Sequence, residues 1–143
     1  MRAYLDTSAF IVARRMGLAP DGVTRPHSIA EFFSTLTRTG LTLLKGGVPI
    51  RAVISPKDAV AAIQRVFARV EFRELTGEAT LASLPRAVKA NVQGAHIHDW
   101  MHAEAAALAH CHLIVTSNAR HFKDVTNLRL VSPEDYFRPA ATE

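Results

Sequence analysis

Four oxygen-bearing side chains stand where predicted strands end or predicted helices begin. Asp6 and Asn118 each follow a short aliphatic run, and Glu31 and Asp99 lie near the starts of two predicted helices. In open parallel sheets, ligands bind beyond the carboxyl ends of the strands, so the four side chains are predicted to converge there. Small hard cations prefer oxygen ligands of this kind, and the set therefore predicts a site for Mg²⁺ or Mn²⁺.

Each of these residues also has an ordinary structural role open to it. Asp6 is suited to cap the helix that follows, and Asp99 is suited to the first turn of another helix. Ser28 and Glu31 match the S-x-x-E capping box, in which Glu31 would bond back to the helix start. Asn118 suits a turn. The metal-site hypothesis therefore depends on the four residues taken together.

Two histidines offer a different metal chemistry. His98 and His102 are four positions apart on one predicted helix with Asp99 between them, which approaches the H-E-x-x-H pattern of zinc enzymes. A zinc hydrolase that uses these histidines is therefore an alternative hypothesis. Asp99 points about 100° away from His98 around the helix, so both histidines are expected on the flank if Asp99 faces the carboxylates. Further candidate nitrogen ligands are His96, His110, His112 and His121.

Short aliphatic strands that alternate with helices would position these side chains. Strands are predicted at 2–5, 71–75, 113–116 and 128–131, and helices at 9–15, 28–38, 56–70, 77–90 and 97–110. This alternation predicts an α/β sandwich around a parallel sheet. The segment 40–49 has no clean periodicity and is predicted to be an inserted loop or hairpin within one domain that spans 1–143.

Composition and charge narrow the class of protein. The chain has 143 residues, 48% of them hydrophobic and 21% charged, which suits a folded globular domain and excludes a disordered polymer. Its net charge is +4, and thirteen of the seventeen cations are arginines, whose planar forks suit phosphate oxygens. The single Cys111 forms no internal disulfide, and Asp6 interrupts the apolar run that a secretion signal needs. No aliphatic run is long enough for a membrane span, so a cytoplasmic location is expected.

Four segments, in chain order, resemble the motifs of PIN-domain ribonucleases. They are YLDTS at 4–8, HSIAEFFSTLT at 27–37, GAHIHD at 94–99 and VTSNARHF at 115–122. The set is similar in particular to VapC-type toxins of bacterial toxin–antitoxin pairs. Asn118 stands where many relatives have Asp, and Trp100 is bulky for a position directly after the third acid. The segment 40–49 is also longer than the family pattern suggests.

This resemblance implies a metal-dependent endoribonuclease with a PIN-like three-layer fold, a mostly parallel central sheet flanked by helices. Asp6, Glu31 and Asp99 would hold one or two Mg²⁺ or Mn²⁺ ions, and Asn118 would complete the catalytic set. The hydroxyls of Ser8 and Thr116 would support these ligands. Basic residues near the motifs are candidates for contact with RNA phosphates: Arg14, Arg15, Arg38, Arg120 and Lys123.

The resemblance also implies partners. RNA would be the substrate, a small antitoxin would be the inhibitor, and the toxin would be a homodimer. Apolar residues that one small domain need not bury, and that a dimer could cover, are Leu36, Leu41, Leu43, Leu44 and the helix at 60–67. A non-catalytic PIN-like module that binds RNA or a protein is the remaining alternative, which the substitution of Asp by Asn118 favours.

Overall fold

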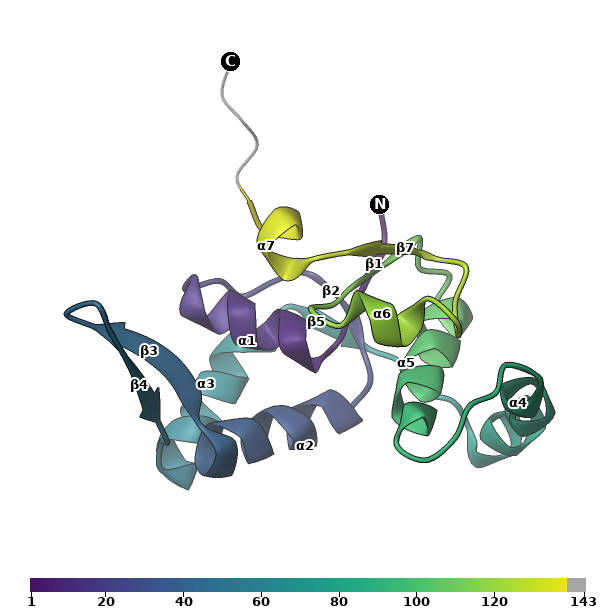
Figure 1. The fold of residues 1–143 in the computed structure, drawn as a ribbon, viewed down its shortest axis with the longest axis horizontal. Helices are drawn as coiled ribbons and strands as arrows, with labels where there is room; N and C mark the ends of the chain where they lie inside the picture. The colour runs from purple at the N-terminus through teal and green to yellow at the C-terminus, as the bar shows by residue number, and fades with distance from the viewer. Residues whose placement is uncertain (139–143) are drawn as a thin grey trace, which may run out of the picture.

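A five-stranded parallel sheet forms the centre of the computed structural model, which describes residues 1–138 except the side chains of Thr39, Leu41 and Leu43. The sheet has the order β5-β2-β1-β6-β7 (Figure 1). Its strands are β1 (Ala3–Leu5), β2 (Gly22–Thr24), β5 (Val70–Phe72), β6 (Leu113–Val115) and β7 (Arg129–Val131). Every neighbouring pair in this sheet is parallel, as the alternation of elements predicts.

Helices connect the strands and cover both faces of the sheet (Figure 1). They are α1 (Thr7–Arg15), α2 (His27–Ser34), α3 (Pro56–Val66), α4 (Gly77–Lys89), α5 (His96–Leu108), α6 (Ala119–Phe122) and α7 (Pro133–Tyr136). A π-helical turn, Thr35–Thr39, extends α2. No helix in the described part of the chain has the length and apolarity that crossing a bilayer requires.

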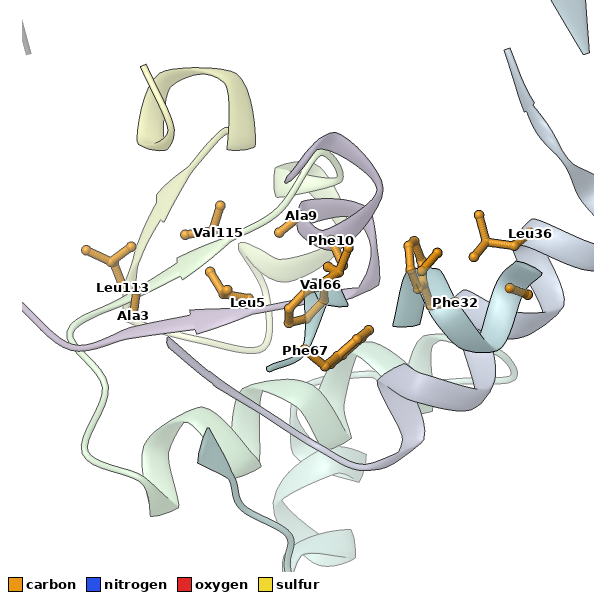
Figure 2. Close-up of a cluster of buried hydrophobic side chains, with 12 residues drawn as sticks. Ala3, Leu5, Ala9, Phe10, Phe32, Leu36, Val66, Phe67, Leu113 and Val115 are labelled. Carbon is orange, nitrogen blue, oxygen red and sulfur yellow. The ribbon is translucent and has the colours of Figure 1, made fainter. Parts of the chain in front are cut away.

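Alternation along the short strands divides the interior into two cores. Ala3 and Leu5 of β1 face the core formed with α1, α2 and α3, which Figure 2 shows. Tyr4, between them, faces the core formed with α4, α5 and α6. Successive strand residues point to opposite faces, so a sheet with two buried faces needs strands that are apolar throughout. The three-layer α/β sandwich predicted from the sequence is therefore confirmed.

The first of these cores uses residues that the sequence analysis assigned to a dimer surface. Leu36 and Phe67 are almost fully buried, and the rings of Phe10 and Phe67 stack with centroids 4.1 Å apart. That assignment is wrong for Leu36, Ala62, Val66 and Phe67, because the π-helical turn packs against α3 and α3 packs against α1. Leu44 and Val60 are exposed as expected, and the side chains of Leu41 and Leu43 lie outside the described residues.

The segment 40–49 lies in an antiparallel hairpin of β3 (Leu41–Lys45) and β4 (Val48–Ala52). The hairpin projects away from the sheet, next to α3 and the end of α2 (Figure 1). Gly40 begins it with a φ of 76°, and a Cβ there would come within 2.6 Å of the Ala52 carbonyl oxygen. Glycine therefore allows the backbones to approach at the base of the hairpin.

Two local features differ from the predictions. The strand β2 was not predicted; Gly22 begins it, and the φ of 151° and the contact with Leu5 exclude a side chain there. Ser28 does not cap α2, which begins at His27 after Pro26; its hydroxyl instead bonds the Thr24 hydroxyl at 2.7 Å. Ser28 therefore ties β2 to α2, and the capping box does not form.

Candidate functional site

The carboxyl ends of β2, β1 and β6 meet at one edge of the sheet. Asp6 follows β1, Thr116 follows β6, and β2 leads into the helix α2 that carries Glu31. The chain passes from β1 to its neighbour β2 on one side and from β6 to its neighbour β7 on the other, so the strand order reverses between β1 and β6. Such a switch point leaves a crevice outside the strand ends, where open α/β sheets bind ligands. The topology therefore brings the first, second and fourth motifs to one place.

Asp6 is the most buried carboxylate at this edge, with 5% of its surface exposed. The hydroxyls of Ser8 and Thr116 donate hydrogen bonds to its two oxygens, each at 2.5 Å, and the Ala9 N–H donates to Oδ1 at 3.2 Å. Ser8 in turn accepts from the Ser117 N–H at 2.8 Å. Asp6 thus caps α1 and also ties β1 to the loop after β6. Asp6 therefore has the capping role that was considered for it, and its carboxylate lies at the edge of the sheet where the metal site is expected.

Burial raises the pKa of Asp6, and the hydrogen bonds from Ser8 and Thr116 and the nearby His102 offset part of that rise. Asp6 makes no ion pair with any residue that the structure describes. A buried carboxylate without a cationic partner is costly, and a bound cation would relieve that cost.

A pH dependence of stability follows from this raised pKa. Between about pH 4, the ordinary carboxyl value, and the raised pKa of folded Asp6, the folded protein keeps a proton that the unfolded chain has lost. The free energy of unfolding is therefore expected to fall as pH rises through this window. Urea titrations in EDTA should show Asp6→Asn gaining stability relative to the parent between pH 4 and pH 8. An equal difference at both pH values would contradict this.

Glu31 is held by two histidines. His102 Nε2 lies 3.3 Å from Glu31 Oε1, and His27 Nε2 lies 3.7 Å from the same oxygen. Burial acts to raise the pKa of Glu31, but the hydrogen bond and charge of His102, together with His27, lower it below the ordinary value. Glu31 is therefore an ionised carboxylate, and the hydrogen bond from the His102 imidazole fixes its orientation.

Asp99 lies in the first turn of α5 and opens onto solvent. Its carboxylate is 23% exposed and lies 4.0 Å from His96 Nε2. An open pocket of about 420 Å³ is lined by Asp99 and His96 together with Arg120 and His121 of α6. His96 Nε2 bonds the His121 carbonyl at 2.8 Å, which holds α5 against α6. Asp99 therefore shares a solvent-accessible pocket with a cation.

The histidines do not both lie on the flank of the site. His102 is buried between Tyr4 and Glu31, so the expectation is wrong for this residue. Asp99 and His102 are three positions apart, which separates them by only about 60° around the helix and places them on one face. His98 stacks on His27 with ring centroids 6.0 Å apart. Both ring nitrogens of His102 have hydrogen-bond partners, Tyr4 and Glu31, which disfavours the zinc alternative.

Asn118 and the basic candidates are spread more widely. Asn118 is exposed, and its backbone N–H donates to the Thr116 hydroxyl at 3.0 Å. Within residues 1–138 its side chain makes no hydrogen bond. Arg14 and Arg15 end α1, about 12 Å from the cap at Asp6 given 1.5 Å per residue. Arg38 lies in the π-helical turn and Lys123 follows α6. Of the five basic candidates, Arg120 shares a pocket with a candidate acid.

Trp100 does not crowd the site. It turns into the second core, where it is 4% exposed and its indole N–H donates to Ser83 at 3.1 Å. The Arg86 guanidinium covers the ring at 5.5 Å and pairs with Glu104. The departure from the family pattern at this position therefore affects packing between α4 and α5 and leaves the site open.

Sequence reasoning missed three contributors to the site. Tyr4 was assigned only to a buried strand, His27 only to a motif, and Thr7 to no role. The Thr7 hydroxyl is buried beside Glu31 and has no well-formed hydrogen bond among the described residues. Alternation offered one signal, since Tyr4 is a polar-tipped residue on the face of β1 that α5 covers.

The donor set fits a magnesium-like ion better than zinc. Among residues 1–138, no three His, Cys, Asp or Glu side chains come together as a preformed metal cluster. Zinc enzymes use three protein ligands, whereas Mg²⁺ is commonly held by one or two carboxylates and several waters. The buried Asp6, which has no ion pair among the described residues, and the ionised Glu31 suit the second arrangement. Asp6, Glu31 and Asp99 would hold such an ion.

Comparison with known proteins supports the fold. No family model matches the chain, and no curated protein matches it by sequence. Its structure is similar to that of VapBC-1 from nontypeable Haemophilus influenzae, with a TM-score of 0.60 and 18% sequence identity. The match covers 93% of this chain and 98% of the other. The parallel sheet flanked by helices is thus a PIN-like α/β fold.

Proposed function

We propose that the protein is a metal-dependent endoribonuclease, the toxin of a VapBC-type toxin–antitoxin pair. The observation that carries the proposal is the buried Asp6 at the switch point of the sheet. His102 lies near Asp6 and is hydrogen-bonded to Glu31. Asp99 lies one turn before His102 on the same helix face. The structural likeness to VapBC-1 and the order of the four motifs support the same function.

A division of labour among the carboxylates follows from their surroundings. A bound divalent ion would supply positive charge to a scissile phosphate and would lower the pKa of a water. Asp6 and Glu31 would serve as its ligands, since one is buried without an ion pair and the other is ionised and oriented. Asp99, which opens onto the pocket, would complete the ligand set and would also accept the proton of the attacking water. The products would be a 5′-phosphate and a 3′-hydroxyl.

Partners are proposed on the same basis. A VapB-like antitoxin is proposed because the similar structure is a VapBC-1 structure. A homodimer is proposed because apolar side chains remain exposed on α4, where Leu81 and Val88 are 70% and 73% exposed. Leu44 and Val48 of the hairpin add exposed apolar surface. Burial of such surface is favourable at roughly 25 cal/mol per Å².

Cleavage of a mixed-sequence RNA in the presence and absence of metal tests the proposed activity. Cleavage is expected with Mg²⁺ or Mn²⁺, to stop with EDTA, and to return when the metal is restored. Glu31→Gln should be inactive, whereas Glu134→Gln, an exposed acid of α7, should match the parent. A parent that binds RNA and cuts none of it with either metal would instead identify the non-catalytic module.

Arg120 is expected to contact an RNA phosphate in the pocket that it shares with Asp99. Arg120→Ala should weaken RNA binding several-fold for all sequences and reduce the slope of log affinity against log salt by about one. Fluorescence anisotropy over a salt series measures both quantities. Arg15→Ala, at the far end of α1, is the matched control. An unchanged salt slope in Arg120→Ala would remove this residue from the RNA interface.

A further inference from the structure

A buried hydrogen-bonded chain runs from the sheet to the site. Tyr4 Oη lies 2.6 Å from His102 Nδ1, and His102 Nε2 lies 3.3 Å from Glu31 Oε1. Tyr4 is fully buried and His102 is 4% exposed. The two rings meet edge to face, with centroids 5.7 Å apart and planes at 65°. Glu31 is thus connected through one imidazole to the central strand β1.

Tyr4 determines which ring nitrogen of His102 carries the proton. A phenol keeps its proton at neutral pH because its ordinary pKa is about 10, so the buried Tyr4 hydroxyl is a hydrogen-bond donor 2.6 Å from Nδ1. A neutral imidazole has one donor and one acceptor nitrogen. If the phenol donates to Nδ1, the proton of the ring must be on Nε2, which faces Glu31. The imidazole then donates a hydrogen bond to the carboxylate.

Packing fixes the plane of the ring as well. Phe122 of α6 lies against His102 with centroids 6.4 Å apart, and Tyr4 covers another edge. An imidazole that is held on several sides gives a carboxylate a fixed hydrogen-bond donor. Groups that orient a metal ligand in this way typically change metal affinity or activity by 10–100-fold when they are removed.

We infer that His102, held in one tautomer by Tyr4, is a positioning residue that orients Glu31 as a metal ligand. The inference rests on the proposed function only in the identity of Glu31 as a ligand; the tautomer and the hydrogen bonds stand apart from it. Glu31 Oε1 lies 3.3 Å from His102 Nε2, which leaves Oε2 as the oxygen available to a cation.

Nitrogen-15 NMR of the histidine rings tests the tautomer in the full-length, metal-free protein at pH 8. His102 is expected to show a protonated Nε2 and an unprotonated Nδ1. Tyr4→Phe should convert this signature to a mixture of tautomers, whereas Tyr136→Phe, which removes a phenol far from the site, should leave it unchanged. A proton on Nδ1, or on both nitrogens, in the parent would overturn the inference.

Calorimetric titration with Mn²⁺ tests the positioning role. His102→Leu, which keeps an apolar side chain of similar size, should bind Mn²⁺ about 10–100-fold more weakly. His102→Gln, which retains an N–H donor toward Glu31, should recover most of the affinity. Equal Mn²⁺ affinity in His102→Leu and the parent would overturn the inference. If His102→Leu does not fold, parental Mn²⁺ affinity in Tyr4→Phe would overturn it instead. A parent that binds no Mn²⁺ but shows the fixed tautomer would overturn the metal site and leave the hydrogen-bonded chain standing.

Discussion

Replacing Asp6 by asparagine is expected to lower the rate of RNA cleavage by about 10³-fold. The carboxylate is the buried ligand candidate at the switch point of the sheet, and asparagine removes its charge while keeping its shape. Stabilisation of phosphate charge by a metal contributes several kcal/mol, and each 1.36 kcal/mol is a factor of ten in rate. The measurement is the single-turnover cleavage rate at saturating Mg²⁺.

The fold should survive this substitution. Asparagine caps helices about as well as aspartate, and the hydroxyls of Ser8 and Thr116 can rotate to suit an amide. Asp21→Asn is the matched control, because Asp21 pairs with Arg69 on the surface and both side chains are largely exposed. Cleavage by Asp6→Asn at the parental rate would show that the metal-dependent chemistry lies elsewhere.

Truncating Phe10 to alanine is expected to reduce the free energy of unfolding by about 3–5 kcal/mol. Phe10 is fully buried on α1, stacks on Phe67 and faces the strands that carry the site (Figure 2). Loss of the ring removes buried apolar surface and leaves a cavity between α1 and α3. Such a cost is a large part of the stability of a small domain. Urea denaturation measures this loss, provided that the dependence of the unfolding free energy on urea concentration has the same slope in the variant and the parent.

Leu81→Ala provides the comparison for Phe10→Ala. Leu81 is 70% exposed on α4, and its truncation should change the free energy of unfolding by less than about 0.5 kcal/mol. Similar losses in the two variants would contradict the assignment of Phe10 to the core. Residual cleavage by the folded fraction of Phe10→Ala is expected to match the parent, since no site residue is changed.

Local sequence patterns were sufficient for the layers of the fold. The segment 113–116 is apolar throughout, as a strand buried on both faces must be, and it forms β6. The alanine-rich segment 97–110 was predicted to be a helix, and α5 covers His96–Leu108 and packs in the second core. The strand β2 was missed because it is short and begins with Gly22, a residue that favours turns but also suits a strand crowded by Leu5.

The arrangement of the site depends on contacts that a linear pattern does not contain. The capping box at Ser28 satisfied every local rule, yet the Thr24 hydroxyl competes for Ser28 and Glu31 turns to His102. Tyr4 and His102 are 98 positions apart and meet only because β1 and α5 pack against each other. The segment 98–102 was interpreted as the pair His98 and His102 with Asp99 between them, and the closeness of Asp99 and His102 on the helix face was not used.

The anomalous scattering of Mn²⁺ in a crystal of the full-length protein tests the central claim most directly. The claim is that Asp6, Glu31 and Asp99 form one divalent-cation site at the carboxyl edge of the parallel sheet. We expect an anomalous peak at this edge with an oxygen of Asp6 among the ligands, and no such peak in Asp6→Asn grown and soaked in the same way. A peak coordinated by His98 and His102 without Asp6, or no peak at this edge in the parent at saturating Mn²⁺, would contradict the claim.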